Sequence, residues 1–327
     1  MTEYSKDSIL LSYAFDGMGG ATALDKKDVS KYLEADSLAW VHMRSDHSDT
    51  RPWLEKELEY LDDIVLDALL ADETRPRIME HRDGVLMILR GVNLNENADP
   101  EDMVSIRVWV DPHRIVSLRR RRLRAVGDVE ERLLQGLGPK NSGDFITELC
   151  SRMFERMEPV LHDLDERTDN VEEQVMEEPN TELRHDIIDI RKQAIMMRRY
   201  ISPQREVLAG LRASTLPWLT NEHKRQLQES LDRLTRYVED LDAIRERAQV
   251  VKDELANVLA DKLNRNMYLL SVIAAIFLPL GFLTGLLGIN VRGNPGADDT
   301  NAFWIFIAML VAIIMAQIAW FKRMGWF

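Results

Sequence analysis

The chain has 327 residues, 45% of them hydrophobic and 30% charged, which suits a soluble region of one or two domains together with a membrane segment. Its net charge is −13, and residues 267–327 carry three basic and two acidic side chains, so residues 1–266 carry −14. That acidity argues against a nucleic-acid partner and suits either contact with cations or solubility alone. Cys150 is the only cysteine, which excludes a disulfide framework and a thiolate zinc cluster.

Residues 1–143 predict a cytosolic α+β domain. Asp111-Pro112-His113-Arg114 is typical of a hairpin turn, and helical patterns occur at Pro52–Leu70 and Leu123–Gln135. Segments rich in β-branched and aromatic residues predict strands at Ile9–Phe15, Leu38–Met43, Val85–Val92, Ser105–Val110 and Ile115–Leu118.

Residues 144–266 predict a charged, all-helical region. We expect one helix from Asp144 to Met176. A second is expected from Thr181 to Tyr200, ending before Pro203, because a proline disfavours helix in the residue that precedes it.

The third helix is predicted to be a long stalk, because neither proline nor glycine occurs between Pro217 and Pro279. About 60 helical residues make a rod of about 90 Å. A rod of this length is not expected to bury its narrow apolar stripe within one chain. The stripe is therefore predicted to pack against neighbouring copies of the chain. The stripe has the three- and four-residue spacing of a coiled coil and comprises Leu227, Leu231, Leu234, Val238, Leu241, Ile244, Ala248, Val251, Leu255 and Val258.

Two uncharged apolar stretches predict transmembrane helices that continue from the stalk. Met267–Leu287 and Ala302–Phe321 are each long enough to cross about 30 Å of hydrocarbon. The loop 288–301 joins them, and a basic tail, 322–327, follows. Basic residues flank the outer ends of this hairpin, whereas the loop holds only Arg292. The positive-inside rule therefore predicts both termini in the cytoplasm, and the start of the chain lacks the pattern of a signal peptide.

One face of the first span is small and weakly polar. Gly281 and Gly285 form a G-x-x-x-G motif, which is typical of close helix packing, but in a symmetric ring the same face would also surround the axis. Pro279 frees one backbone carbonyl within this span. The residues of the face recur four and three apart: Met267, Ser271, Ala274, Leu278, Gly281, Gly285 and Gly288.

Gly288-Ile289-Asn290 follows the first span. Glycine lets a helix end in left-handed geometry, and Asn290 offers a neutral amide oxygen. A ring of such oxygens can hold a cation through its water shell. The alternative interpretation is an ordinary helix end.

The stretch NRNMYLLSVIAAIFLPLGFLTGLLGIN, followed by a short loop and the ending FKRMGWF, closely resembles the CorA superfamily of divalent-cation transporters. Ile289 replaces the methionine of that superfamily's Gly-Met-Asn motif. This aliphatic residue, together with the segments Leu66–Ile78 and Ile195–Leu208, is similar to the ZntB zinc-transporter branch. The resemblance implies a homopentamer with a cytosolic αβα funnel, a stalk helix continuous with a pore-lining first span, and a second span outside it.

The resemblance also implies roles for single residues. Asn290 would form the outer cation-binding ring, and Gly281 stands where magnesium transporters often carry a hydroxyl. The acidic pair through which magnesium closes those channels matches Asp253, but its partner falls on Ala68, with Asp67 one position earlier, so closure by magnesium is not expected. The implied pore positions are Asn264, Met267, Leu270, Leu278, Gly281, Gly285 and Asn290, with Met267, Leu270 and Leu278 as the apolar constriction.

Other candidates carry less weight. His42 and His47, with Asp46 and Asp49, could contact cytosolic zinc, although a polar surface is the favoured interpretation. Asp298 and Asp299 in the loop either concentrate cations or only keep it soluble. The basic run Arg119–Arg122 is expected to be solvated or paired with acids.

Zinc transport through a pentameric pore in the bacterial inner membrane is the leading hypothesis, with its direction and any proton coupling open. The two spans hold no His, Cys, Asp or Glu, so the ion is expected to pass at least partly hydrated. The expected partners are copies of the chain, membrane lipid and divalent cations. No enzyme motif or resident cofactor is expected. A magnesium, cobalt or nickel channel is the alternative in the same class, and a membrane-anchored oligomeric scaffold is the alternative in another.

Overall fold

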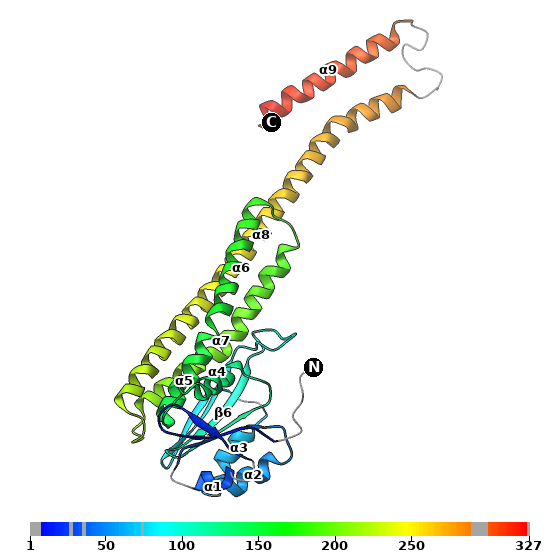
Figure 1. The fold of residues 1–327 in the computed structure, drawn as a ribbon. Coiled ribbons are helices and arrows are strands. Elements are labelled where there is room, and N and C mark those ends of the chain that lie inside the picture. The colour runs from blue at the N-terminus through cyan, green and yellow to red at the C-terminus, as the bar shows by residue number, and fades with distance from the viewer. Residues whose placement is uncertain (1–7, 26–28, 35–36, 73–74, 289–299, 326–327) are drawn as a thin grey trace. The chain divides into compact units, whose positions relative to one another are not determined.

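The computed structural model describes residues 8–25, 29–34, 37–72, 75–288 and 300–325 (Figure 1). The chain divides into two compact units, Met1–Asp253 and Glu254–Phe327, and the helix α8 contributes to both. Each unit is described by itself.

The first unit is built on a seven-stranded sheet of order β2-β1-β3-β7-β6-β5-β4. All neighbouring strands are antiparallel except β3 and β7, which are parallel. The five predicted strands are confirmed to within one residue at each end, whereas the two edge strands, β2 and β4, were not predicted. The strands are β1 (Ile9–Phe15), β2 (Ala21–Ala23), β3 (Ala39–Arg44), β4 (Arg77–His81), β5 (Gly84–Gly91), β6 (Val104–Val110) and β7 (Arg114–Arg119).

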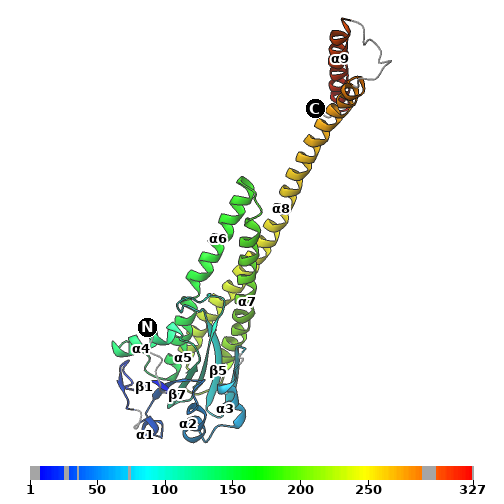
Figure 2. The same cartoon turned by 90° about the vertical axis from the view of Figure 1, so that its right-hand side faces the viewer.

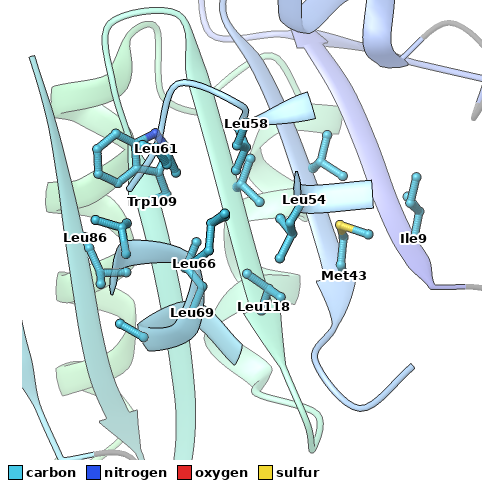
Figure 3. Packing of buried hydrophobic residues seen from close by; sticks show 14 of the residues in the cluster. Ile9, Met43, Leu54, Leu58, Leu61, Leu66, Leu69, Leu86, Trp109 and Leu118 are labelled. Atoms are coloured by element: carbon cyan, nitrogen blue, oxygen red, sulfur yellow. The ribbon is translucent and has the colours of Figure 1, made fainter. Parts of the chain in front are cut away.

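One face of the sheet is covered by three short helices, α1 (Val29–Glu34), α2 (Thr50–Glu57) and α3 (Asp63–Leu70). Figure 3 shows leucines of α2 and α3 packed against side chains of β3, β5, β6 and β7, all of them buried. The helical pattern at Pro52–Leu70 corresponds to two helices, α2 and α3, separated by a short non-helical segment. The chain turns before Asp62, which has extended backbone angles and is the N-cap of α3, a position that aspartate favours.

The other face of the sheet carries α4 (Arg124–Leu134), α5 (Ser142–Glu155) and α7 (Leu183–Ala213), so the unit has αβα layers (Figure 2). The rings of Trp40 in β3 and Phe145 in α5 meet edge to face, with their centroids 5.0 Å apart. The predicted turn between β6 and β7 is confirmed.

Two helix boundaries differ from the prediction. The expected helix from Asp144 to Met176 is two helices, α5 and α6 (Glu158–Glu177), because Pro159 lies in the first turn of α6, where its missing N–H costs nothing. The next helix does not end before Pro203: α7 continues to Ala213. Its buried Gln204 accepts a hydrogen bond of 2.9 Å from the backbone N–H of Arg90 in β5. Docking on the sheet therefore outweighs the cost of a proline inside a helix.

The long third helix is confirmed as α8, Asn221–Leu287, which spans 67 residues without a break. From Leu227 to Val251 its apolar stripe is already buried within one chain, apart from the half-buried Leu231, so the expectation that the stripe needs neighbouring copies is wrong. The reason is that α5, α6 and α7 pack along α8 (Figure 1). Ion pairs join these helices, including Arg198–Asp242 at 2.7 Å and Arg247–Glu172 at 2.7 Å.

Candidate functional site

The second unit holds the two helices that are long and apolar enough to cross a membrane, the end of α8 and α9 (Ala302–Arg323). At 1.5 Å per residue, the 22 residues of α9 extend about 33 Å, which matches the hydrocarbon core of a bilayer. Both expected spans are therefore helices. Between Met267 and Leu287 neither Asp, Glu, Lys nor Arg occurs, so no ionised side chain lies within that span.

The described part of the hairpin shows which side of α8 meets α9. Val272 is only 5% exposed, although most residues around it are open. The side-chain amide of Gln317 in α9 donates to the carbonyl oxygen of Ala275, at 3.5 Å. Phe321, one turn beyond Gln317, is also buried. These residues define the contact side of α8.

The predicted small face lies on the opposite side of α8. Gly281 follows Val272 by nine residues, which is two and a half helical turns, so the two point in opposite directions. Met267, Leu270 and Leu278 are 53%, 68% and 71% exposed.

The remaining positions of this face and of the implied pore are open as well, apart from the half-buried Ala274. Asn264 and Ser271 are exposed, and Ser271 donates its hydroxyl to the carbonyl of Met267, at 2.8 Å. A Cβ added to Gly281 or Gly285 would meet nothing within 4 Å. One chain alone therefore leaves this uncharged face without a covering element among the described residues.

The turn after α8 is described only at its first residue. Gly288 follows the last helical residue and donates its N–H to the carbonyl of Thr284, at 2.9 Å. Ile289, Asn290, Asp298 and Asp299 lie outside the described residues. The role assigned to the Gly-Ile-Asn turn stays a prediction.

The acidic candidates of the first unit, Asp67 and Asp253, each accept hydrogen bonds from a different neighbouring side chain. Asp67 accepts a hydrogen bond of 2.6 Å from Arg51, and its neighbour Ala68 is buried in the core under the sheet. Asp253 accepts from the amide of Gln249 at 2.8 and 2.9 Å. Among the described residues, no three His, Cys, Asp or Glu side chains are placed to share a metal ion.

The favoured interpretation of His42 as part of a polar surface is wrong. His42 is fully buried on β3, its Nδ1 lies 2.7 Å from Ser117 Oγ, and that oxygen accepts the indole N–H of Trp40 at 2.8 Å. Burial lowers the pKa of His42 to about 3, and the charge of Arg119 acts in the same direction. The ring is therefore neutral, and its Nε2 has no partner within the described part of the chain.

The neighbouring polar residues lie at the surface. His47 is 3.8 Å from Asp49, and Asp46 pairs with Arg44 at 2.9 Å. His42 and His47 therefore do not form one site. The basic run pairs with acids as expected at two positions, where Arg120 meets Asp72 at 3.6 Å and Arg121 meets Asp102.

An αβα domain, a long helix and two membrane-length helices define an α+β membrane protein of the two-span class. The family model described as CorA-like Mg2+ transporter protein matches residues 35–323, so the chain belongs to the CorA-like family.

Named relatives match over nearly the whole length. The zinc transport protein ZntB of Yersinia enterocolitica is 36% identical over 315 residues, which is 96% of this chain and 95% of that protein. The divalent cation transporter CmaX of Pseudomonas aeruginosa is 35% identical, over 97% of this chain and 96% of its own. The solved full-length CmaX structure superposes with a TM-score of 0.85 and 34% identity, covering 99% of this chain and 100% of that one.

Gln317 is the residue of this site that the sequence interpretation missed. A single amide in an otherwise apolar span was the available signal, because buried polar groups in membranes need partners. Pro279 marks a freed carbonyl in the first span, but nothing in the sequence indicates that this part of α9 approaches it.

Proposed function

We propose that this protein transports zinc, and with it related divalent cations, through a pore formed around the small face of α8. The observation that carries the proposal is that this face is uncharged, exposed and turned away from α9. Membership of the CorA-like family supports transport, and relatives named as zinc and divalent-cation transporters favour zinc.

A homopentamer is proposed as the transporting unit. The stripe of α8 does not support it, because most of that stripe is buried within one chain. Support comes instead from the resemblance and from the small face, which needs a covering surface that one chain lacks among its described residues. The basic residues at the outer ends of the hairpin favour the bacterial inner membrane with both termini in the cytoplasm.

The ion is proposed to pass at least partly hydrated. Asn290 would hold it at the outer mouth through water, with Asp298 and Asp299 raising its local concentration. Met267, Leu270 and Leu278 would narrow the path. Protein dipoles alone stabilise a bare divalent ion poorly, and conduction needs binding that is not too strong.

Metal flux into proteoliposomes tests the proposal, with Asn290→Ala and Asn290→Asp as variants. Loss of five amide oxygens should abolish uptake, whereas five carboxylates should tighten binding and lower flux. Met315→Leu, at an exposed position of α9, is the matched control and should transport normally. The mass of the solubilised protein should remain that of a pentamer throughout.

Wild-type flux in both Asn290 variants would show that Asn290 does not bind the ion and belongs to an ordinary helix end. Absence of flux in the wild-type protein, with a stable oligomer, would favour the membrane-anchored scaffold. Flux of magnesium, cobalt or nickel in preference to zinc would favour the alternative channel.

A further inference from the structure

Pro279 leaves one backbone carbonyl of the first span without its helical partner. In an α-helix each N–H donates to the carbonyl four residues earlier, and proline has no N–H. The carbonyl concerned belongs to Ala275. The helix nevertheless continues without interruption to Leu287.

The side-chain amide of Gln317 donates a hydrogen bond to that carbonyl. Its Nε2 lies 3.5 Å from the oxygen of Ala275, across the contact between α8 and α9. Pro279 follows Val272 by seven residues, close to two full turns, so the proline lies on the contact side of α8. The donor from α9 thus reaches the helix on the side where the carbonyl is freed.

The carbonyl of Ala275 and the side-chain amide of Gln317 would each raise the free energy of the protein if they were buried in hydrocarbon without a hydrogen-bond partner. Hydrocarbon offers no donor to a free carbonyl, and an unpaired amide is equally poorly placed there. Gln317 is the only amide or charged side chain between Ala302 and Phe321. Its position therefore coincides with the single backbone defect that Pro279 creates in the neighbouring helix.

We infer that Gln317 is a positioning residue, which holds the first span in shape at Pro279 by replacing the missing helical hydrogen bond. This inference rests on the proposed function in one respect, that the face being positioned lines the pore. Leu278 and Gly281, which flank Pro279, belong to that face. Without the bond, α8 gains freedom to bend at this point and the face moves.

A double-mutant cycle on the full-length protein in nanodiscs tests the inference. Gln317→Met keeps the length of the side chain and removes its donor. It is introduced into the native protein and into a Pro279→Ala background, where the restored N–H at position 279 serves the carbonyl. Amide hydrogen exchange in residues 267–287 is measured in each.

In the native background, Gln317→Met should raise local exchange about threefold, which follows from the usual strength of side-chain hydrogen bonds between membrane helices. In the Pro279→Ala background it should change nothing or slow exchange, because Gln317 Oε1 is buried without a partner in the described structure. Thr284→Val is the matched control. Among the described residues the Thr284 hydroxyl bonds to carbonyls of its own helix alone, at 3.0 and 3.1 Å, so its effect should be equal in both backgrounds.

An equal effect of Gln317→Met in both backgrounds would overturn the pairing. Zinc flux is measured on the four proteins of the cycle: the native protein, Gln317→Met, Pro279→Ala and the double variant. The loss of flux caused by Gln317→Met should disappear in the Pro279→Ala background. Native flux in Gln317→Met would overturn the positioning role. The exchange cycle needs no transport, so a protein that moves no metal would refute the proposed function and leave the pairing to be judged separately.

Discussion

Acidification should destabilise the first unit through His42. This side chain is fully buried on β3 between strands and helices, with its Nδ1 bonded to Ser117. Burial lowers its pKa from 6.5 to about 3, so the folded protein keeps the ring neutral where an unfolded chain would protonate it. The stability that this neutral state provides is complete above pH 6.5 and is lost as the pH falls toward 3.

The magnitude follows from the two pKa values. Below pH 6.5 the unfolded chain binds one proton more than the folded one, so stability falls by up to about 1.4 kcal/mol per pH unit. Between pH 7.5 and pH 5 the loss is about 2 kcal/mol. For a unit of this size, that corresponds to a fall of roughly 4–8 °C in the midpoint of thermal unfolding.

Tryptophan fluorescence during heating of the detergent-solubilised protein provides the assay, since Trp40 lies beside His42, with ring centroids 6.2 Å apart. His42→Gln keeps a polar side chain near Ser117 and removes the titration. The unfolding midpoint of the native protein minus that of this variant is measured at pH 7.5 and at pH 5. This difference should fall by roughly 4–8 °C between the two pH values. A relative midpoint that is the same at both pH values would refute the argument.

Two further predictions concern the first unit. Gly143→Ala should destabilise it by about 1–3 kcal/mol in urea unfolding, because the new Cβ would lie 2.2 Å from the ring of His223, which is buried and bonded to Asp144 at 2.8 Å. Gly127→Ala, in a helix with open space around it, should instead stabilise slightly. Zinc flux should be insensitive to magnesium, because Ala68 is buried and carries no ligand; strong inhibition relieved by Asp253→Ala would contradict this.

The strands that the sequence predicted are those with one buried face or two. In β5 and β6 nearly every residue is buried, so their apolar runs stand out. The edge strand β4 has the sequence RIMEH and mostly open or half-buried residues, and its pairing with β5 depends on tertiary structure. Local composition could not predict it.

Helix ends and helix partners were harder to predict than helices. Pro203 predicts a helix end, yet α7 continues through it, and the hydrogen bond of Gln204 to β5 holds this part of α7 on the sheet. The stripe of α8 suggests an interface between copies only because periodicity reveals that a face is buried and not what covers it. The partners are α5, α6 and α7 of the same chain, whose own apolar residues give no pairing information.

The candidate site was predictable as a face but not as a contact. Spacing of four and three residues placed Met267, Leu278 and Gly281 on one side of the span, and the structure leaves that side open. The bond from Gln317 to Ala275 joins residues 42 positions apart and requires the approach of two helices. No local pattern encodes that approach.

The described span of α8 constrains how an ion could be selected in the proposed pore. Its open face offers methyl groups, glycine backbone, one hydroxyl and the thioether of Met267, and none of the thiolate or imidazole ligands that usually hold zinc in proteins. Recognition by His or Cys ligation is therefore not available along this face. What remains is discrimination by hydrated size at the constriction and by water-mediated contact at the Asn290 turn, both of which separate divalent ions only modestly. A preference for zinc would then arise mainly from residues outside the first span, where the excess of acidic side chains in residues 1–266 can raise the local cation concentration.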